Sequence, residues 1–422
     1  MNSDLKNGIH LNMIQTKKYK TVRIVLKFKT TLSAENSTKR TLISSLLETN
    51  SEKYPTQTSF RSKLADLYGA SLSTGISKKG NMHILSLSMS VVNEKYLQSE
   101  AQLMEEVVQF IQEILFAPHV KNGAFDEATF LREKENLADY YLSIFDDKQA
   151  YTSLQLQELY YDGVQKIPSI GCLEELEKID AASLYAYYQD MLQNDEMDIY
   201  VLGDIDPAKM AALFKQLPFK NRETISNPVF YNQKVSEEIV TKNEVQDITQ
   251  AKFNLLYQTG LYYHQDAYFA GQIFNGLFGG FPHSKLFMNV REKASLAYYA
   301  SSQLDSFRGT MVVQTGIETE KMPQVKDIIA AQLSALQAGD FSEEDFVQTK
   351  EMLKNQVLQS EDSGIAVIEK AYSHDLIKKA PLTPSEWFEG IDQVTREDVI
   401  SVANQVHLQA SFFLSGEEKN NG

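Results

Sequence analysis

The residues that could bind a metal are few and scattered. The chain has one cysteine, Cys172, which has no second cysteine to pair with, and seven histidines: His10, His83, His119, His264, His283, His374 and His407. A helical zinc site takes two imidazoles about one turn apart, and no two of these histidines lie three to five residues apart. His264 and Asp266 come nearest to a ligand pair. The sequence therefore offers no pair of neighbouring histidines on which a zinc site could form.

Arg291 and Tyr298 are candidates of another kind: both side chains donate hydrogen bonds, and it is the resemblance of their surroundings to a known family that singles them out. A guanidinium and a phenol both keep their protons near neutral pH. In a dry site such donors stabilise the negative charge that builds on a carbonyl oxygen during peptide hydrolysis, by roughly several kcal/mol. On the residues alone the alternative stays open that Arg291 is a cation near a helix end and Tyr298 a half-buried strand residue.

Length, composition and charge limit the class of protein. A chain of 422 residues with 43% hydrophobic residues predicts two large domains with packed cores. The net charge of −15 argues against binding to nucleic acid and to anionic membranes, which both reward clusters of Lys and Arg. No run approaches the roughly 18 apolar residues of a membrane span, and the first residues lack the apolar core of a signal peptide. We expect a soluble, cytoplasmic protein.

The chain contains an internal duplication. Three pairs of segments recur in the same order, at offsets of 216, 215 and 224 residues: 125–137 with 341–353, 178–184 with 393–399, and 70–72 with 294–296. Strands that alternate apolar and polar residues are predicted at 22–28, 83–89, 197–202 and 410–414, and amphipathic helices at 98–116, 125–145, 322–338 and 342–360. Grouped strands and grouped helices indicate an α+β fold. We predict a first domain over 1–217, a linker over 218–245 and a second domain over 246–422.

Several stretches of the sequence resemble one enzyme family. They are Lys39-Arg40-Thr41, Tyr54-Pro55-Thr56, Leu67-Tyr68-Gly69-Ala70 and Leu286-Phe287-Met288-Asn289-Val290-Arg291-Glu292-Lys293-Ala294-Ser295-Leu296-Ala297-Tyr298. Nearly the whole chain resembles the M16 family of pitrilysin and mitochondrial processing peptidases, and most of all its short bacterial M16B members. The resemblance implies two homologous domains, each a mostly antiparallel sheet with helices packed on it. It also implies that Arg291 and Tyr298 bind substrate opposite a zinc ion.

The zinc motif of that family is altered in this chain. The motif is His-x-x-Glu-His on a helix, in which the imidazoles bind zinc and the Glu activates water. The corresponding positions here hold Ser45, Glu48 and Thr49. Without a metal to acidify water, Glu48 is better explained as a remaining helix carboxylate than as a base. We expect no zinc in this chain.

The third zinc ligand of the family is a Glu on a later helix, in a stretch like Glu-Lys-x-x-x-x-x-Glu. Glu133 matches the first Glu of that stretch, and Tyr140 falls at the ligand position, although a shift of one residue would place Asp139 there. At most one carboxylate would therefore replace three ligands, which is too few to hold zinc.

The resemblance implies a subunit of a metallopeptidase that is inactive alone. A zinc-bearing M16B homologue would be its partner in a heterodimer, and zinc is expected in that partner. The substrate would be a short or unfolded peptide. The alternative is a structural or peptide-binding protein with no role in hydrolysis, like the core subunits of respiratory complexes. A metal-free hydrolase acting through Glu48 alone is disfavoured, because no pair of nucleophile and base is visible.

Overall fold

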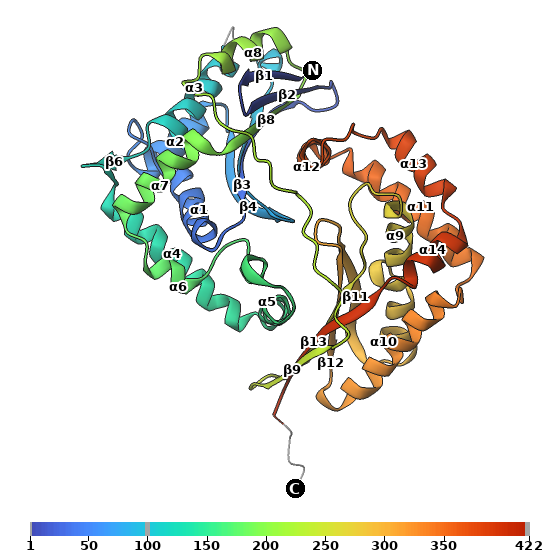
Figure 1. Ribbon diagram of the computed structural model, residues 1–422. Helices are drawn as coiled ribbons and strands as arrows, with labels where there is room; N and C mark the ends of the chain where they lie inside the picture. The colour runs from blue at the N-terminus through green and yellow to red at the C-terminus, as the bar shows by residue number, and fades with distance from the viewer. Residues whose placement is uncertain (1, 98–101, 418–422) are drawn as a thin grey trace. The chain divides into compact units, whose positions relative to one another are not determined.

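The computed structural model describes residues 2–97 and 102–417. The chain forms two compact units (Figure 1). The first unit comprises Met1–Leu142, Ile167–Val229 and Ser363–Lys379, and the second comprises Ser143–Lys166, Phe230–Asp362 and Ala380–Gly422. Each unit thus takes a short segment from the part of the sequence that mainly builds the other. The predicted division into 1–217, 218–245 and 246–422 stays a prediction.

The first unit is built on a six-stranded sheet in the order β1-β2-β8-β3-β5-β4. Its strands are β1 (Asn2–Lys6), β2 (Ile9–Gln15), β3 (Thr21–Thr31), β4 (Ser71–Lys79), β5 (Met82–Val92) and β8 (Glu196–Gly203). All neighbours pair antiparallel except β2 and β8, which run parallel.

The second unit repeats this topology. Its sheet has the order β11-β12-β10-β13-β9, formed by β9 (Val240–Val245), β10 (Ala251–Gln258), β11 (Ala297–Asp305), β12 (Thr310–Ile317) and β13 (His407–Ser415). Read from the other edge, the order β9-β13-β10-β12-β11 matches β2-β8-β3-β5-β4 strand for strand. The one parallel pair, β9 with β13, also falls at the matching place. The predicted α+β fold with two homologous, mostly antiparallel domains is confirmed.

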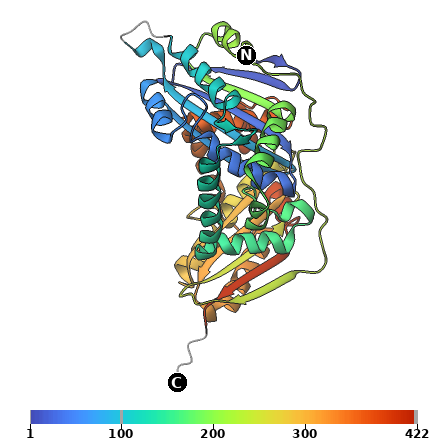
Figure 2. The same ribbon diagram turned by 90° about the vertical axis from the view of Figure 1, so that its left-hand side faces the viewer.

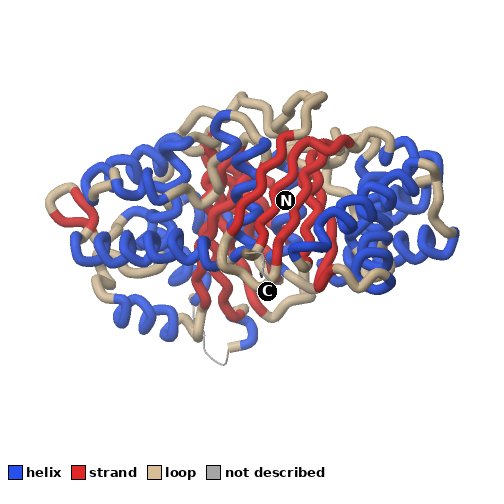
Figure 3. Tube along the Cα trace, turned by 90° about the horizontal axis from the view of Figure 1, so that it is seen from below, coloured by secondary structure: helices blue, strands red, loops and turns tan. Residues whose placement is uncertain are grey.

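Helices of each unit gather on one face of its sheet (Figure 3). In the first unit Ile24, Leu26 and Phe28 of β3 are fully buried in the core that this face forms with the helices. The helices of this unit are α1 (Ala34–Leu47), α2 (Gln57–Asp66), α3 (Leu103–Phe116), α4 (Glu127–Asp146), α6 (Leu173–Glu177), α7 (Ala181–Asn194) and α8 (Pro207–Lys215). Those of the second unit are α9 (Tyr268–Asn275), α10 (Met322–Gln337), α11 (Glu343–Ser360), α13 (Pro384–Gln393) and α14 (Arg396–Ala403).

Two further helices are exchanged between the halves of the sequence. Helix α5 (Lys148–Tyr160) follows α4 in the chain but packs on β10 and β13 of the second unit. Helix α12 (Gly364–Leu376) follows α11 but packs on β8 and β3 of the first unit. Each sheet is therefore covered on its second face by a helix from the opposite half of the sequence.

The duplication extends to single hydrogen bonds. In α4 the Lys134 ammonium donates to the carbonyl oxygen of Ile179, at 2.6 Å. In α11 the Lys350 ammonium donates to that of Val394, at 2.7 Å. These residues belong to two of the sequence pairs that revealed the repeat, so each lysine ties its long helix to the segment after the next helices in the same way.

The long helices and the strands lie where the sequence predicts them, although residues 98–101 of the predicted helix 98–116 lie outside the described residues. Residues 218–239, within the predicted linker, form neither helix nor strand and run as an extended segment into β9 (Figure 2). Among the helices formed by the described residues, none is long and apolar enough to cross a membrane.

Candidate functional site

Helix α1 carries the altered zinc motif and is fixed firmly in the first unit. Ser33 begins it with a capping box shared with Asn36. One turn later the Arg40 side chain is fully buried, where its guanidinium forms an ion pair with Asp195 and donates to the carbonyl oxygen of Phe28. A buried, paired guanidinium sets both the depth and the rotation of the helix.

The two residues that replace the histidines direct their hydroxyls to their own backbone. Helix α1 ends at Leu47, so Ser45 lies in its last turn while Thr49 follows the helix. The Thr49 hydroxyl donates to the carbonyl oxygen of Ser45 at 2.9 Å, and the Ser45 hydroxyl donates to that of Thr41 at 3.5 Å. Hydroxyls engaged in this way are not presented as metal ligands.

Glu48, the remaining charged residue of the motif, is held by a strand. Its carboxylate accepts a hydrogen bond from the backbone N–H of Thr74 in β4, and the Thr74 hydroxyl lies within hydrogen-bonding distance as well. Strand β4 is the edge of the first sheet. Glu48 therefore satisfies a backbone donor at a sheet edge, which is a structural task and leaves the carboxylate poorly placed to take a proton from water.

Tyr140, the predicted counterpart of the third zinc ligand, lies on α4 and is half exposed. Its neighbour Tyr141 donates its hydroxyl to the carbonyl oxygen of Ile170 and so turns into the protein. No group of three or more His, Cys, Asp or Glu side chains within residues 2–97 and 102–417 could hold a metal ion. The residues at this site do not fit zinc, and no step of catalysis is derived through a metal here.

Arg291 and Tyr298 lie in one short stretch of the second unit. Arg291 is in the π-helical segment η4 (Phe287–Lys293), where its guanidinium stacks 4.6 Å from the centroid of the Phe287 ring. The chain then turns sharply, with Ser295 at a positive φ of 51° and the N–H of Leu296 donating to the carbonyl oxygen of Val290. Segments with π-helical geometry are frequent at functional sites.

A β-bulge presents the second of these side chains. Strand β11 loses register with β12 between Ala297 and Tyr299, so Tyr298 is the unpaired residue. It lies on an edge strand and is 64% exposed, and the Arg291 side chain is 44% exposed. Bulges often re-aim a side chain next to a binding site. The sequence carried one signal for this geometry, since the adjacent tyrosines 298 and 299 break the alternation expected of a strand.

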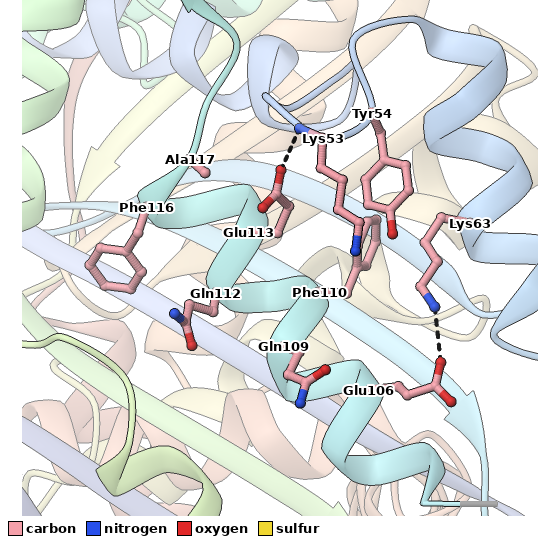
Figure 4. Close-up of a pocket in the computed structure, with 10 residues that line it drawn as sticks. All are labelled: Lys53, Tyr54, Lys63, Glu106, Gln109, Phe110, Gln112, Glu113, Phe116 and Ala117. Carbon is pink, nitrogen blue, oxygen red and sulfur yellow. Dashed lines mark hydrogen bonds and ion pairs between the residues drawn. The ribbon is translucent and has the colours of Figure 1, made fainter.

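A groove in the first unit lies between α2 and α3 (Figure 4). It has a volume of about 530 Å³, with aromatic side chains such as Tyr54 and Phe110 among its lining. Two of its carboxylates are engaged: Glu106 lies 2.9 Å from the Lys63 ammonium, and Glu113 accepts from the backbone N–H of Lys53 at 2.7 Å. The groove contains none of the residues of the altered zinc motif.

Comparisons with known proteins agree with this geometry. The family described as "Peptidase M16 inactive domain" matches residues 178–353. The "Probable inactive metalloprotease YmfF" of Bacillus subtilis (strain 168) is 36% identical over 415 residues, covering 97% of this chain and 96% of that protein. The "Uncharacterized zinc protease YmxG" of the same organism is 23% identical over 327 residues, covering 75% and 77%.

A solved structure supports the same assignment. The crystal structure of a conserved protein from Enterococcus faecalis V583 is 49% identical in sequence and superposes with a TM-score of 0.95. The match covers 100% of this chain and 99% of that one. Together with the relative that is 36% identical over nearly its whole length, it accounts for both units of the fold. The chain therefore belongs to the M16 peptidase family, as an inactive homologue of its metalloproteases.

Proposed function

We propose that this chain is the zinc-less subunit of an M16B-type metallopeptidase. It pairs with a zinc-bearing homologue, which supplies the metal and the base, and it contributes Arg291 and Tyr298 to the binding of the peptide. Neither donor changes protonation near neutral pH, so both can hold and polarise a peptide carbonyl throughout the reaction. That one relative is described as a zinc protease and another as an inactive metalloprotease, both from one organism, is in keeping with such a pair.

The contrast between the two sets of family residues carries this proposal. Ser45, Glu48 and Thr49 have all been turned to structural hydrogen bonds in the first unit. Arg291 and Tyr298 remain exposed, on a π-helical turn and a β-bulge, two local distortions that cost stability and have no evident structural purpose. A chain kept only as a scaffold would have no need of either.

The substrate that fits is an extended peptide, short or unfolded. Strand β11, which carries Tyr298, pairs only with β12 among the described strands, so its other edge has backbone groups available. An extended peptide can add to such an edge through main-chain hydrogen bonds, while nearby side chains select its sequence. A folded protein has no free extended segment to offer.

Cleavage of a quenched fluorescent peptide library tests the proposal. The chain, a zinc-bearing homologue from the same genome and their equimolar mixture are assayed separately, and we expect activity only in the mixture. Arg291→Ala should lower kcat/KM of the mixture by about 10² to 10³, the usual effect of removing one donor to a developing oxyanion. Lys293→Ala removes a cation from the same segment η4 and serves as the matched control, with activity unchanged.

Assembly is measured in parallel by native mass spectrometry, so that a lost interface is not mistaken for a lost donor. A mixture that forms the heterodimer but is no more active than the homologue alone would contradict a role in hydrolysis. That result would favour the alternative, a structural or peptide-binding protein.

A further inference from the structure

The face of the first sheet that is turned away from its core carries charged and polar residues at alternate positions. His10 and Asn12 lie on β2, Lys29 on β3, and Glu196 and Asp198 on β8. The strand register places these residues side by side, since His10 is paired with Asp198 in the parallel β2–β8 ladder and Lys29 with Glu196 in the β3–β8 ladder. All five are at least partly buried, which is unusual for so many ionisable groups.

These residues line a cavity of about 720 Å³ that lies wholly within the first unit. Segment 224–229 and the end of α12 complete its walls. Met82, Ile225 and Leu376 give the cavity an apolar side, while Lys378 and Lys379 lie at the end of α12. The cavity therefore combines a polar floor with space and apolar surface for a short alkyl chain.

Most charged groups of the cavity are already engaged. The Glu196 carboxylate accepts from the Lys29 ammonium at 2.9 Å and from the backbone N–H of Ile225 at 2.8 Å. Asp4 lies 2.7 Å from the Nδ1 atom of His10. Asp375 accepts a hydrogen bond from the hydroxyl of Tyr200.

Two groups on the floor are not engaged in this way. The Asp198 side chain is 8% exposed, yet no group in the described part of the chain donates a hydrogen bond to its carboxylate, and the nearest cation, the Lys29 ammonium, is 3.9 Å away. Asn12 is 6% exposed, lines the cavity, and its side-chain amide forms no hydrogen bond with any described residue. Both side chains are more than nine-tenths buried, yet their polar atoms reach the cavity, so a ligand there can supply the hydrogen-bond partners that the protein does not.

We propose that this cavity binds a small organic cation, a protonated primary amine, whose ammonium donates to the Asp198 carboxylate and to the amide oxygen of Asn12. The two unengaged acceptors match the several N–H donors of an ammonium. The alkyl chain lies against Met82, Ile225 and Leu376. A metal ion does not fit, because the described residues form no group of three His, Cys, Asp or Glu suited to one.

Burial of Asp198 gives the site a pH dependence. The pKa of Asp198 is raised to about 6, mainly by burial; Lys29 and His10 lower it, and the charges of Glu196 and Asp375 add to the rise. An ammonium binds the ionised carboxylate, so affinity should fall as pH drops below about 6. The charged or titratable groups that face the cavity from the surrounding elements are Asp4, His10, Lys29, Glu196, Tyr200, Asp375, Lys378 and Lys379.

Isothermal titration calorimetry with n-butylamine at pH 7.5 tests the proposal on the full chain. We expect saturable binding at one site per chain. Asp198→Asn should weaken binding at least about tenfold and Asn12→Ala to a smaller extent, because the charge supplies the larger share of the attraction. Glu106→Gln, the same kind of carboxylate-to-amide change in the groove between α2 and α3, is the control and should leave the affinity unchanged.

Other ligands show which chemistry the cavity selects. 4-Aminobutanoate should bind at least as well as n-butylamine, since its carboxylate can face the lysines at the end of α12, whereas acetate should not bind. Absence of saturable n-butylamine binding up to about 10 mM, or equal affinity of the wild type and Asp198→Asn, would overturn the proposal. Circular dichroism confirms that each variant is folded. None of these outcomes depends on whether the chain takes part in peptide hydrolysis.

Discussion

The helices α5 and α12 hold equivalent places in the two units but differ in their contacts, since among the described residues only α12 pairs with a buried charge of its sheet. Helix α5 covers the second sheet through an apolar cluster: Leu156, Tyr160, Tyr161, Leu256, Ala410, Phe412 and Leu414. Helix α12 also buries apolar side chains, Ile368 and Tyr372, with Tyr372 edge-on to Tyr200 of β8, but it adds charged contacts to the first sheet. Its Glu369 pairs with the buried ammonium of Lys27, and its Asp375 accepts from Tyr200. One topology therefore supports two kinds of interface.

The two interfaces differ in how much they stabilise the fold. Burial of apolar surface stabilises a helix on a sheet by about 25 cal/mol per Å², whereas a buried ion pair roughly offsets its own desolvation. The contacts of α5 are those of a core. The ion pair between Glu369 of α12 and Lys27 returns about what its desolvation costs, and Asp375 of the same helix lines the cavity that holds Asp198 and Asn12. This difference suggests that the first sheet keeps its polar face for binding.

The largest effect is expected from a substitution in the apolar cluster between α5 and the second sheet. Leu156→Ala removes a side chain that is 1% exposed and should destabilise the second unit by about 2–5 kcal/mol, through lost burial and the cavity left behind. The only tryptophan, Trp387, is buried in this unit and reports its unfolding by fluorescence in urea. Ile365→Ala, an exposed position on α12, is the control, expected within about 0.5 kcal/mol of the wild type. A Leu156→Ala cost below about 1 kcal/mol would contradict the assignment of α5 to a core.

A smaller loss of stability is expected from a substitution in the ion pair between α12 and the first sheet. Glu369→Gln keeps the shape of the side chain and an acceptor oxygen but removes the negative charge that pairs with the Lys27 ammonium, whose side chain is 1% exposed. We expect a cost of about 2 kcal/mol, below the 3–5 kcal/mol of a fully buried pair because Glu369 is 40% exposed. Hydrogen exchange of the β3 amides measures it, and Trp387 fluorescence should not change.

A substitution of the partner in this ion pair makes the test more specific. Lys27→Met removes the buried charge altogether, so the double variant Lys27→Met with Glu369→Gln should recover most of the loss. Additive losses, with no recovery in the double variant, would mean that Lys27 and Glu369 are not energetically coupled, and would contradict this account of the ion pair.

Of the strands, the sequence predicted β3, β5 and β8 of the first sheet and β13 of the second, where buried apolar residues recur along the strand. It left the other strands unassigned. It did not predict which sheet α5 and α12 cover, since an amphipathic pattern shows that a helix has an apolar face but not what that face contacts. Strand β9 was also missed. Its residues are mostly exposed and polar, and only the pairing with β13 makes Val240–Val245 a strand.

Part of the candidate site could likewise be predicted from the sequence, and part of it could not. The positions Ser45, Glu48 and Thr49 could be found from the motif spacing, but the bond from Thr74 to Glu48 spans 26 residues and needs the fold. The roles predicted for Arg291 and Tyr298 stay a prediction, although the bulge that exposes Tyr298 gives them a physical basis. The sequence shows Asp198 as a charged residue within a run of apolar ones. It does not show that the carboxylate of Asp198 lacks hydrogen-bond partners.

The smallest effect concerns Asp198 itself, and its sign is opposite to the others. Its pKa in the folded chain is raised to about 6, above the value of about 3.9 in an unfolded chain, so the folded state binds the proton more tightly. Its contribution to stability is complete below about pH 4 and is lost as pH rises through 6. Asp198→Asn should therefore stabilise the ligand-free protein by about 1–2 kcal/mol at pH 7.5, less than the full shift implies because the new amide still lacks a partner.

The pH profile separates this effect from other titrations. Burial, with help from the charges of Arg40 and Lys78, lowers the pKa of His83 to about 3, so His83 destabilises the fold as pH falls below about 6.5. That loss is shared by the wild type and Asp198→Asn, and it cancels in the difference between them. The difference, measured by urea unfolding of the first unit, should shrink from pH 7.5 to near zero at about pH 4.5. A difference in stability that is constant with pH would mean that Asp198 is not a buried carboxylate without hydrogen-bond partners. The polar residues on this face of the first sheet would then need no ligand to explain them.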